Sequence, residues 1–262
     1  MSTPRPIRPF RILAATLGVV GIAVSIYLAL YWRPTWPLPV TITHAALEVD
    51  GARREYRLAI PHSTQGKTNL PVVFALHGAL DTVDEMATYT DLDRLAADKG
   101  FLLVYLQGRL LNWPPCIPEE NPTYIDADLH FFEAAIDEMV RNHHADRKRV
   151  YVLGVSQGGA MANLITAKRS ELIAATVCSC GWMPRPLDEQ ALDTKNKCPI
   201  LFVVGSEDTQ VPPAMVQKAC DAFKKDGHPT EFRIIPGLGH GWPRDPKITA
   251  EIWAFLTVKQ LP

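Results

Sequence analysis

The sequence predicts an α/β domain built on a mostly parallel central sheet with helices on both faces, preceded by one N-terminal transmembrane helix. Short apolar runs rich in β-branched residues alternate with longer helix-forming stretches through most of the chain, which is typical of βαβ units. Several of these runs are apolar throughout, as expected for parallel strands that are buried on both sides. A charge-free run over residues 12–32 predicts the transmembrane helix.

Length and composition indicate one globular domain of ordinary size with an additional segment. The chain has 262 residues, of which 47% are hydrophobic, so it can bury a sizeable core. Its formal net charge of −1 speaks against a nucleic-acid partner, because such partners require a basic surface.

The N-terminal segment has the features of a membrane anchor. As a helix, residues 12–32 would be ~31 Å long, which matches a hydrocarbon core of about 30 Å. Three arginines and no acidic residue precede this run, at Arg5, Arg8 and Arg11. Residues 1–32 are therefore expected to form a basic cytoplasmic stub and an anchor, which places the rest of the chain outside the cytoplasm. The alternative is a secretory signal peptide cleaved near the small residues 23–25, which would release the domain on the same side.

The rest of the chain divides into a spacer and a domain. Residues 33–39 contain three prolines, which cannot continue a helix and favour a short stiff spacer. Residues 40–262 form the predicted domain. It begins with a β-hairpin, residues 40–49 and 54–60, because the Asp50-Gly51 pair is a strong hairpin signal. Apolar runs predict further strands at residues 71–78, 101–105, 150–153, 174–178, 200–205 and 231–235; helical patterns predict helices within 84–98 and at 126–142, 157–169, 213–226 and 247–258.

The stretch G-V-S-Q-G, residues 154–158, lies between the strand at 150–153 and the start of a helix. Small residues at Gly154 and Gly158 allow strand and helix to approach closely, so that a strained turn exposes the hydroxyl of Ser156 at the carboxyl edge of the sheet. This is the pattern of a nucleophile elbow. The alternative interpretation is a glycine-rich turn in which the serine only caps the helix.

A serine hydroxyl needs a base and an orienting acid, and in this kind of sheet they follow the serine in the order acid, then histidine. Asp208 lies in the loop after the strand at 200–205, with Glu207 as its only close rival. His240 lies between two glycines in the loop after the strand at 231–235. We therefore predict Ser156, Asp208 and His240 as a catalytic triad.

An oxyanion intermediate needs two backbone N–H donors. The residue after the nucleophile, Gln157, is predicted to supply one, and Ala79, in the loop after the strand at 71–78, is predicted to supply the other. His77 is expected to brace that loop by hydrogen bonding. Trp113 and Trp242 fall in loops at the same edge and are candidates for lining a substrate pocket.

From about residue 72 to residue 242, the sequence resembles the extracellular esterases of the polyhydroxybutyrate depolymerase and feruloyl or acetylxylan esterase group. The matching pieces are L-H-G at 76–78, N-W at 112–113, D-x-D-x-x-F-F from 126, D-R-K-R-V-Y-V-L-G-V-S-Q-G-G-A-M from 146, G-S-E-D-T-Q-V-P from 205 and G-H-G-W-P from 239. The resemblance implies an α/β-hydrolase fold and a serine esterase with Ser156 as nucleophile, Asp208 as acid and His240 as base.

The predicted function is hydrolysis of small-molecule or polymer-derived carboxylic esters through an acyl-enzyme, with no cofactor and no metal. Two alternatives stay open. The same residues would serve a peptidase, a thioesterase or a lactone hydrolase, because the first chemical step is shared. A membrane-tethered binding protein could also keep the scaffold without turnover.

The five cysteines allow at most two disulfides. Cys116 and Cys180 both follow strands toward the carboxyl edge, so we expect a bridge between them. Cys178 is expected to be a buried core thiol, and a Cys198–Cys220 bridge is a weaker expectation.

Overall fold

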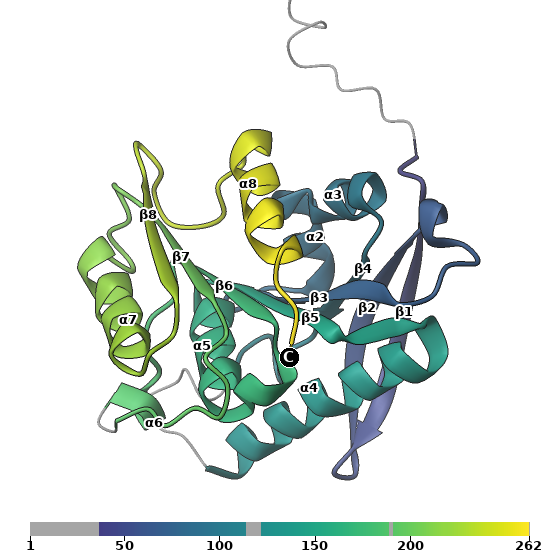
Figure 1. Cartoon of the computed structure of the whole chain (residues 1–262), viewed down its shortest axis with the longest axis horizontal. Coiled ribbons are helices and arrows are strands. Elements are labelled where there is room, and N and C mark those ends of the chain that lie inside the picture. Colours follow the sequence, from purple (N-terminus) through teal and green to yellow (C-terminus); the bar gives the residue numbers. More distant parts are fainter. Residues whose placement is uncertain (1–36, 114–121, 189–190, 262) are drawn as a thin grey trace, which may run out of the picture. The chain divides into compact units, whose positions relative to one another are not determined.

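The computed structural model describes residues 37–113, 122–188 and 191–261 (Figure 1). The chain divides into two units, Met1–Pro37 and Leu38–Pro262, and the fold described below is that of the second unit. The predicted transmembrane helix and most of the predicted spacer lie outside the described residues. Among the residues that are described, no helix is both long enough and apolar enough to span a bilayer.

The second unit is built on a sheet in which the described residues form eight strands in the order β1-β2-β4-β3-β5-β6-β7-β8. The first two neighbouring pairs, β1 with β2 and β2 with β4, are antiparallel, and every later pair is parallel. The strands are β1 (Val40–Val49), β2 (Ala52–Pro61), β3 (Leu70–Leu76), β4 (Leu102–Leu106), β5 (Ala145–Val155), β6 (Ala175–Ser179), β7 (Ile200–Gly205) and β8 (Thr230–Ile235).

Helices cover both faces of this sheet. Figure 1 shows α3 (Leu92–Lys99) and α8 (Pro246–Thr257) on one face, and α4 (Pro122–His143) and α5 (Gln157–Arg169) on the other. The remaining described helices are α2 (Val83–Thr90), α6 (Arg185–Asp188) and α7 (Pro213–Lys225), with short 3₁₀ turns at His62–Thr64 and Ser170–Leu172. The predicted mostly parallel sheet with helices on both faces is confirmed.

The N-terminal hairpin forms where the sequence predicts it. Asp50 and Gly51 have φ values of 51° and 73°, which are the positive values that a two-residue type I′ turn requires at both positions. The turn sets the register in which Val49 pairs with Ala52. The hairpin forms the antiparallel edge of the sheet, and the parallel strand β8 forms the opposite edge.

Several element boundaries differ from the prediction. The helix expected within residues 84–98 is two helices, because Asp91 adopts a left-handed φ of 54° between α2 and α3. Aspartate tolerates this conformation better than most residues, and no glycine or proline marks the break in the sequence. In addition, β5 begins at Ala145 instead of residue 150, so the charged residues 146–149 belong to the strand.

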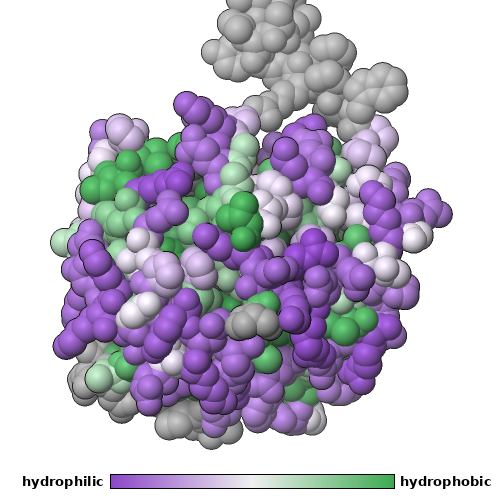
Figure 2. Space-filling view, in the orientation of Figure 1, coloured by the Kyte–Doolittle hydropathy of each residue, from purple (hydrophilic) through white to green (hydrophobic). Residues whose placement is uncertain are grey.

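The core lies between the sheet and its helices. The central strands β3, β4, β6 and β7 are almost entirely buried, as is β5 from Val150 onward, and their apolar sequences predict this. Phe74 of β3 packs edge-on against Phe132 of α4 with ring centroids 5.2 Å apart. The face in Figure 2 is largely hydrophilic, with smaller groups of hydrophobic residues. The parallel strands all end at one edge of the sheet, and the loops that follow them meet there.

Candidate active site

Ser156 occupies a sharp turn between β5 and α5, with φ 56° and ψ −118°. A positive φ is unfavourable for a residue with a side chain, by about 1–3 kcal/mol, and persists only where the surroundings hold it. Two glycines make this packing possible. A Cβ on Gly154 would lie 2.0 Å from the carbonyl oxygen of Gly158, and a Cβ on Gly158 would lie 2.1 Å from that of Leu76. The predicted strand, strained turn and helix are therefore confirmed.

Three side chains from separate loops meet at this edge of the sheet. Nε2 of His240 lies 2.8 Å from Oγ of Ser156, and Nδ1 of His240 lies 2.8 Å from Oδ2 of Asp208. An ionised carboxylate can only accept, so Nδ1–H of the ring donates to Asp208 and leaves Nε2 to accept from the serine hydroxyl. The three residues that the sequence predicted thus form one hydrogen-bonded line.

The carboxylate of Asp208 is held in place from its other side. Its Oδ1 accepts backbone N–H bonds from Gln210 at 3.0 Å and Val211 at 2.8 Å, which leaves Oδ2 for the histidine. Asp208 is buried, whereas the rival Glu207 is exposed. The acid loop also packs directly on the histidine loop, because a Cβ on Gly205 would lie 2.0 Å from the carbonyl oxygen of Leu238. Acid and base are therefore positioned together.

The residues predicted to form the oxyanion hole lie on two neighbouring loops. Gln157 is the first residue of α5, and its side-chain Oε1 accepts a hydrogen bond from the backbone N of Trp113 at 2.9 Å. Ala79 is exposed in the turn after β3. The residue before it, Gly78, lies against the serine, since a Cβ placed there would be 3.7 Å from Cβ of Ser156. This loop is thus close enough to face an ester bound at Ser156.

His77 braces that loop, as the sequence analysis expects. Its ring is fully buried, Nδ1–H donates to the carbonyl of Gly78 at 2.7 Å, and Nε2 accepts from the backbone N of Gly108 at 2.9 Å and the side chain of Gln107 at 2.8 Å. Burial lowers the pKa of His77. A neutral ring with both nitrogens bonded has no capacity left for proton transfer, so its role is structural.

The two candidate tryptophans are buried within the part of the chain that the structure describes, and neither contributes to the lining of the groove described below. Trp113 is only 1% exposed; its Nε1–H donates to the carbonyl of His77 at 2.9 Å, and the two rings lie 5.3 Å apart. Trp242 is 4% exposed. Both indoles pack beneath the loops that carry them. The sequence places them at the correct edge of the sheet but cannot show on which side of a loop a side chain lies.

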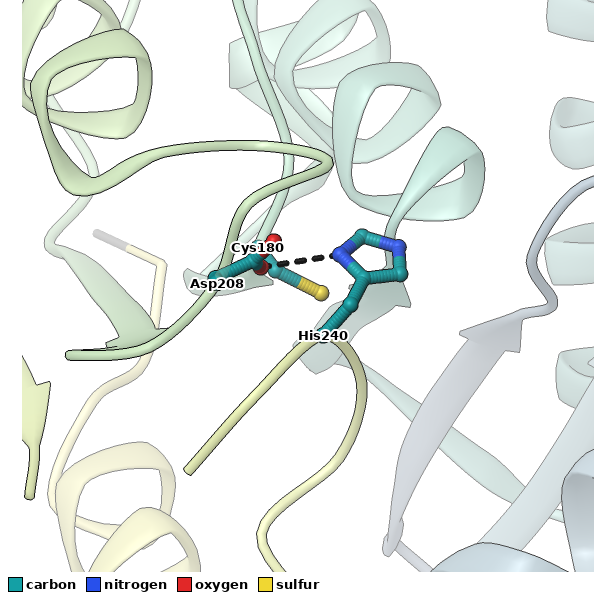
Figure 3. Close-up of side chains that lie close together, drawn as sticks. All are labelled: Cys180, Asp208 and His240. Atoms are coloured by element: carbon teal, nitrogen blue, oxygen red, sulfur yellow. Dashed lines mark hydrogen bonds and ion pairs between the residues drawn. The ribbon is translucent and has the colours of Figure 1, made fainter. Parts of the chain in front are cut away.

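Cys180 lies at the edge of the sheet where the sequence predicts it, but beside Asp208 and His240 instead of in a disulfide. Cys180 directly follows β6 with φ 41°, and its Sγ–H donates to the carbonyl of Gly241, the residue after His240, at 3.6 Å. One ligand atom from each of Cys180, Asp208 and His240 lies within 4.8 Å of the other two. Figure 3 shows the sulfur beside the hydrogen bond that joins the other two residues.

The cysteines also correct the predicted disulfides. Cys178, Cys180, Cys198 and Cys220 are all free and buried. The Cys116–Cys180 bridge is therefore absent, since the thiol of Cys180 packs inward against the histidine loop; Cys116 itself lies outside the described residues. The Cys198–Cys220 bridge is also wrong, because Cys198 packs against His228 instead, with Sγ 3.9 Å from Nδ1. The expectation that Cys178 is a buried core thiol is confirmed.

Two buried histidines outside the hydrogen-bonded line should make the free energy of unfolding depend on pH. Burial is the largest influence on the pKa of both His77 and His228 and lowers it in the folded chain. The unfolded chain then binds more protons as the pH falls below about 6.5, so the free energy of unfolding should decrease on acidification, by up to about 1.4 kcal/mol per pH unit for each group. Urea unfolding between pH 7.5 and pH 5 measures this decrease in the free energy of unfolding.

The matched controls for this pH dependence are two histidine variants. His228→Gln should show a shallower decrease, whereas replacement of the exposed His62 by glutamine should leave the slope unchanged. Stability that is flat or rises on acidification would contradict the assignment.

An open groove of about 590 Å³ lies next to the loop that follows β3. It is lined by Ala79, Leu80, Asp81, Asp84, Glu85, Thr88 and Tyr89. Leu80 is 75% exposed, and three of the residues that line the groove carry carboxylates. Asp84 is ion-paired with Arg57 at 3.0 Å, which leaves Asp81 and Glu85 as the other acidic side chains of the groove.

One protein family and several known proteins are similar to parts of this chain, and the part that the family matches includes the candidate site. The sequence pattern of the dienelactone hydrolase family matches residues 119–253, a range that contains all three residues of the hydrogen-bonded line. NocK of Nocardia uniformis subsp. tsuyamanensis, which is named as an esterase, is 29% identical over 239 residues, covering 88% of this chain and 63% of NocK. Feruloyl esterase B of Thermothelomyces thermophilus is 28% identical over 118 residues, covering 44% of this chain and 40% of that enzyme. The chain thus spans less than two thirds of these relatives.

Solved structures match the fold. A ferulic acid esterase superposes with a TM-score of 0.65 at 17% identity, over 84% of this chain and 99% of its own. Esterase PE8 superposes with a TM-score of 0.57 at 19% identity, over 82% and 99%. An acylaminoacyl peptidase also superposes, with a TM-score of 0.61 at 18% identity, over 90% and 44%. The fold is therefore the expected α/β-hydrolase fold, and the fold by itself does not separate esters from peptides.

Proposed function

This chain belongs to the dienelactone hydrolase family, and we propose on that basis that it hydrolyses carboxylic esters, with Ser156 as nucleophile, His240 as base and Asp208 as the orienting acid. One observation carries the proposal: the continuous hydrogen-bonded line from Ser156 Oγ through His240 to Asp208, with both bonds at 2.8 Å. A base within hydrogen-bonding reach of a hydroxyl, itself oriented by a buried acid, is the arrangement that serine nucleophiles need. The ester-cleaving relatives support the same reaction class.

The reaction proceeds in two steps through an acyl-enzyme. His240 takes the proton of Ser156 as the oxygen attacks the ester carbonyl, and Asp208 stabilises the imidazolium that forms. The backbone N–H groups of Gln157 and Ala79 hold the oxyanion. His240 then gives its proton to the leaving alcohol, and a water molecule repeats the sequence to release the acid.

The groove beside Ala79 predicts which esters should be hydrolysed with the higher kcat/KM. Small neutral esters should be hydrolysed faster than esters whose acyl group carries a carboxylate, because the groove beside Ala79 is lined by the acidic side chains of Asp81 and Glu85. The difference in kcat/KM should shrink in high salt, since exposed charges are screened. The measurement is a panel of acetyl, butyryl, feruloyl and hemisuccinyl esters at low and high ionic strength.

A second set of substrates separates the proposed reaction from its alternatives. A peptide anilide, a thioester and a lactone that share one acyl group with a test ester serve as matched compounds. Turnover of the ester with little turnover of the anilide is expected. Faster cleavage of the anilide or the thioester would replace the proposed substrate class, and absence of turnover on every compound would favour a binding protein.

We also propose that residues 1–32 anchor the chain in a membrane, with the domain on the extracytoplasmic side. The charge-free run over residues 12–32 and the arginines before it support this orientation. Protease added to intact cells stripped of any outer barrier should digest the domain and leave a short membrane fragment. A cytoplasmic protein that stays intact is the control. A protected domain would exclude the orientation, and a mature protein beginning near Ile26 would instead indicate a cleaved signal peptide.

A further inference from the structure

A third ligating side chain lies beside the acid and base of the hydrogen-bonded line. Cys180 is 0% exposed, and it lies between the elbow and the acid loop, because its backbone N donates to the carbonyl of Val203 at 2.7 Å while the backbone N of Ser156 donates to the carbonyl of Ser179 at 2.9 Å. The strand end is fixed tightly, since a Cβ on Gly181 would lie 2.5 Å from the backbone of Gly159. The backbone that carries the thiol is therefore fixed beside the site.

The donor atoms match the requirements of a thiophilic cation. Zn²⁺ and Cd²⁺ prefer sulfur and imidazole nitrogen and accept a carboxylate oxygen, and Zn²⁺ holds such atoms about 3.3–3.8 Å apart in a tetrahedral site. One donor atom from each of Cys180, Asp208 and His240 lies within 4.8 Å of the other two, so adjustments of about 1 Å suffice. The side chain of His240 is 18% exposed, which gives an ion a path past the ring.

We propose that Cys180, Asp208 and His240 form an inhibitory site for a thiophilic divalent cation such as Zn²⁺. The ion binds Sγ of Cys180, Oδ2 of Asp208 and Nδ1 of His240, and water completes its coordination. The thiol releases one proton to solvent as the metal–sulfur bond forms. A thiolate, a carboxylate and a divalent cation together carry no net charge, which favours the complex in a buried place.

The inhibition follows from the tautomer of His240. The proton that Nδ1 donates to Asp208 must move to Nε2 when the metal takes the lone pair of Nδ1. Nε2–H then faces Ser156, and the ring can no longer accept the serine proton. The ion takes no part in hydrolysis and is not a cofactor. The inhibition rests on the proposed function, whereas the binding of the ion does not.

The experiment titrates the full-length chain with CdCl₂ and with ZnCl₂ in a chelator-free buffer. Cd²⁺ should give the ultraviolet charge-transfer absorption of a cadmium–thiolate bond, and Zn²⁺ should inhibit hydrolysis of an aryl ester. The activity of each protein is expressed relative to its own activity without zinc. On this scale, the zinc concentration that halves the activity of Cys180→Ser should be about 100-fold higher than that of the wild type, because a metal ligand is lost. Cys220→Ser, which removes a buried free thiol on α7, is the matched control and should titrate like the wild type.

Three results would overturn the proposal. They are inhibition of Cys180→Ser at the wild-type zinc concentration, a cadmium–thiolate signal that is unchanged in that variant, and the absence of that signal from wild-type protein. Cys180→Ala serves if the serine variant does not fold, and the wild-type signal decides the question if neither variant folds. If the cadmium signal depends on Cys180 but no ester is hydrolysed, the site stands and the proposed function fails.

Discussion

Replacing Ser156 by alanine should reduce kcat for an aryl ester by at least about 10⁴-fold, because the acyl-enzyme route requires its hydroxyl. The remaining turnover would come from the oxyanion donors and from His240 acting on water. Alanine keeps the same backbone and removes only an oxygen that is half-buried at the edge of the site. The free energy of unfolding should therefore change by no more than about 0.5 kcal/mol.

Two measurements check this substitution. Steady-state hydrolysis gives kcat, and a fluorophosphonate probe should label the wild type at Ser156 but leave the variant unlabelled. Urea unfolding of both proteins separates loss of chemistry from loss of fold. Activity that stays above a few per cent of the wild-type value would show that another residue is the nucleophile.

Replacing Asp208 by asparagine should lower kcat by about 10³ to 10⁴-fold through the tautomer of His240. Oδ1 of the aspartate accepts two backbone N–H bonds, so the asparagine would keep its oxygen there and turn its amide NH₂ toward the histidine. Nδ1 would then have to accept that hydrogen bond, which moves the ring proton to Nε2. The ring would present N–H, and not a lone pair, to Ser156.

The matched variants are Glu207→Gln and His240→Ala. Glu207 is an exposed neighbour of the acid, and its substitution should leave kcat nearly unchanged. His240→Ala should cost more than Asp208→Asn, because it removes the base itself. The carboxylate assignment is wrong if the change at Glu207 lowers kcat more than the change at Asp208.

The sequence by itself determined the order of the elements and the three residues of the hydrogen-bonded line. Strand apolarity and helix periodicity are local properties, so the central strands and most helices could be assigned from them. Gly154 and Gly158 are also informative locally, because their spacing around Ser156 requires a turn with no room for side chains. Asp208 and His240 could be found since each follows a strand, and the ends of parallel strands meet at one edge.

Only the tertiary structure decided which way the side chains at that edge point. Trp113 and Trp242 belong to the correct loops, yet both indoles are buried under them, because the direction of a loop side chain depends on packing between segments distant in sequence. The left-handed backbone at Cys180 also depends on packing between segments distant in sequence. A positive φ turns its thiol toward the histidine loop, some sixty residues away in the chain, and so places sulfur beside Asp208 and His240 in place of the expected disulfide.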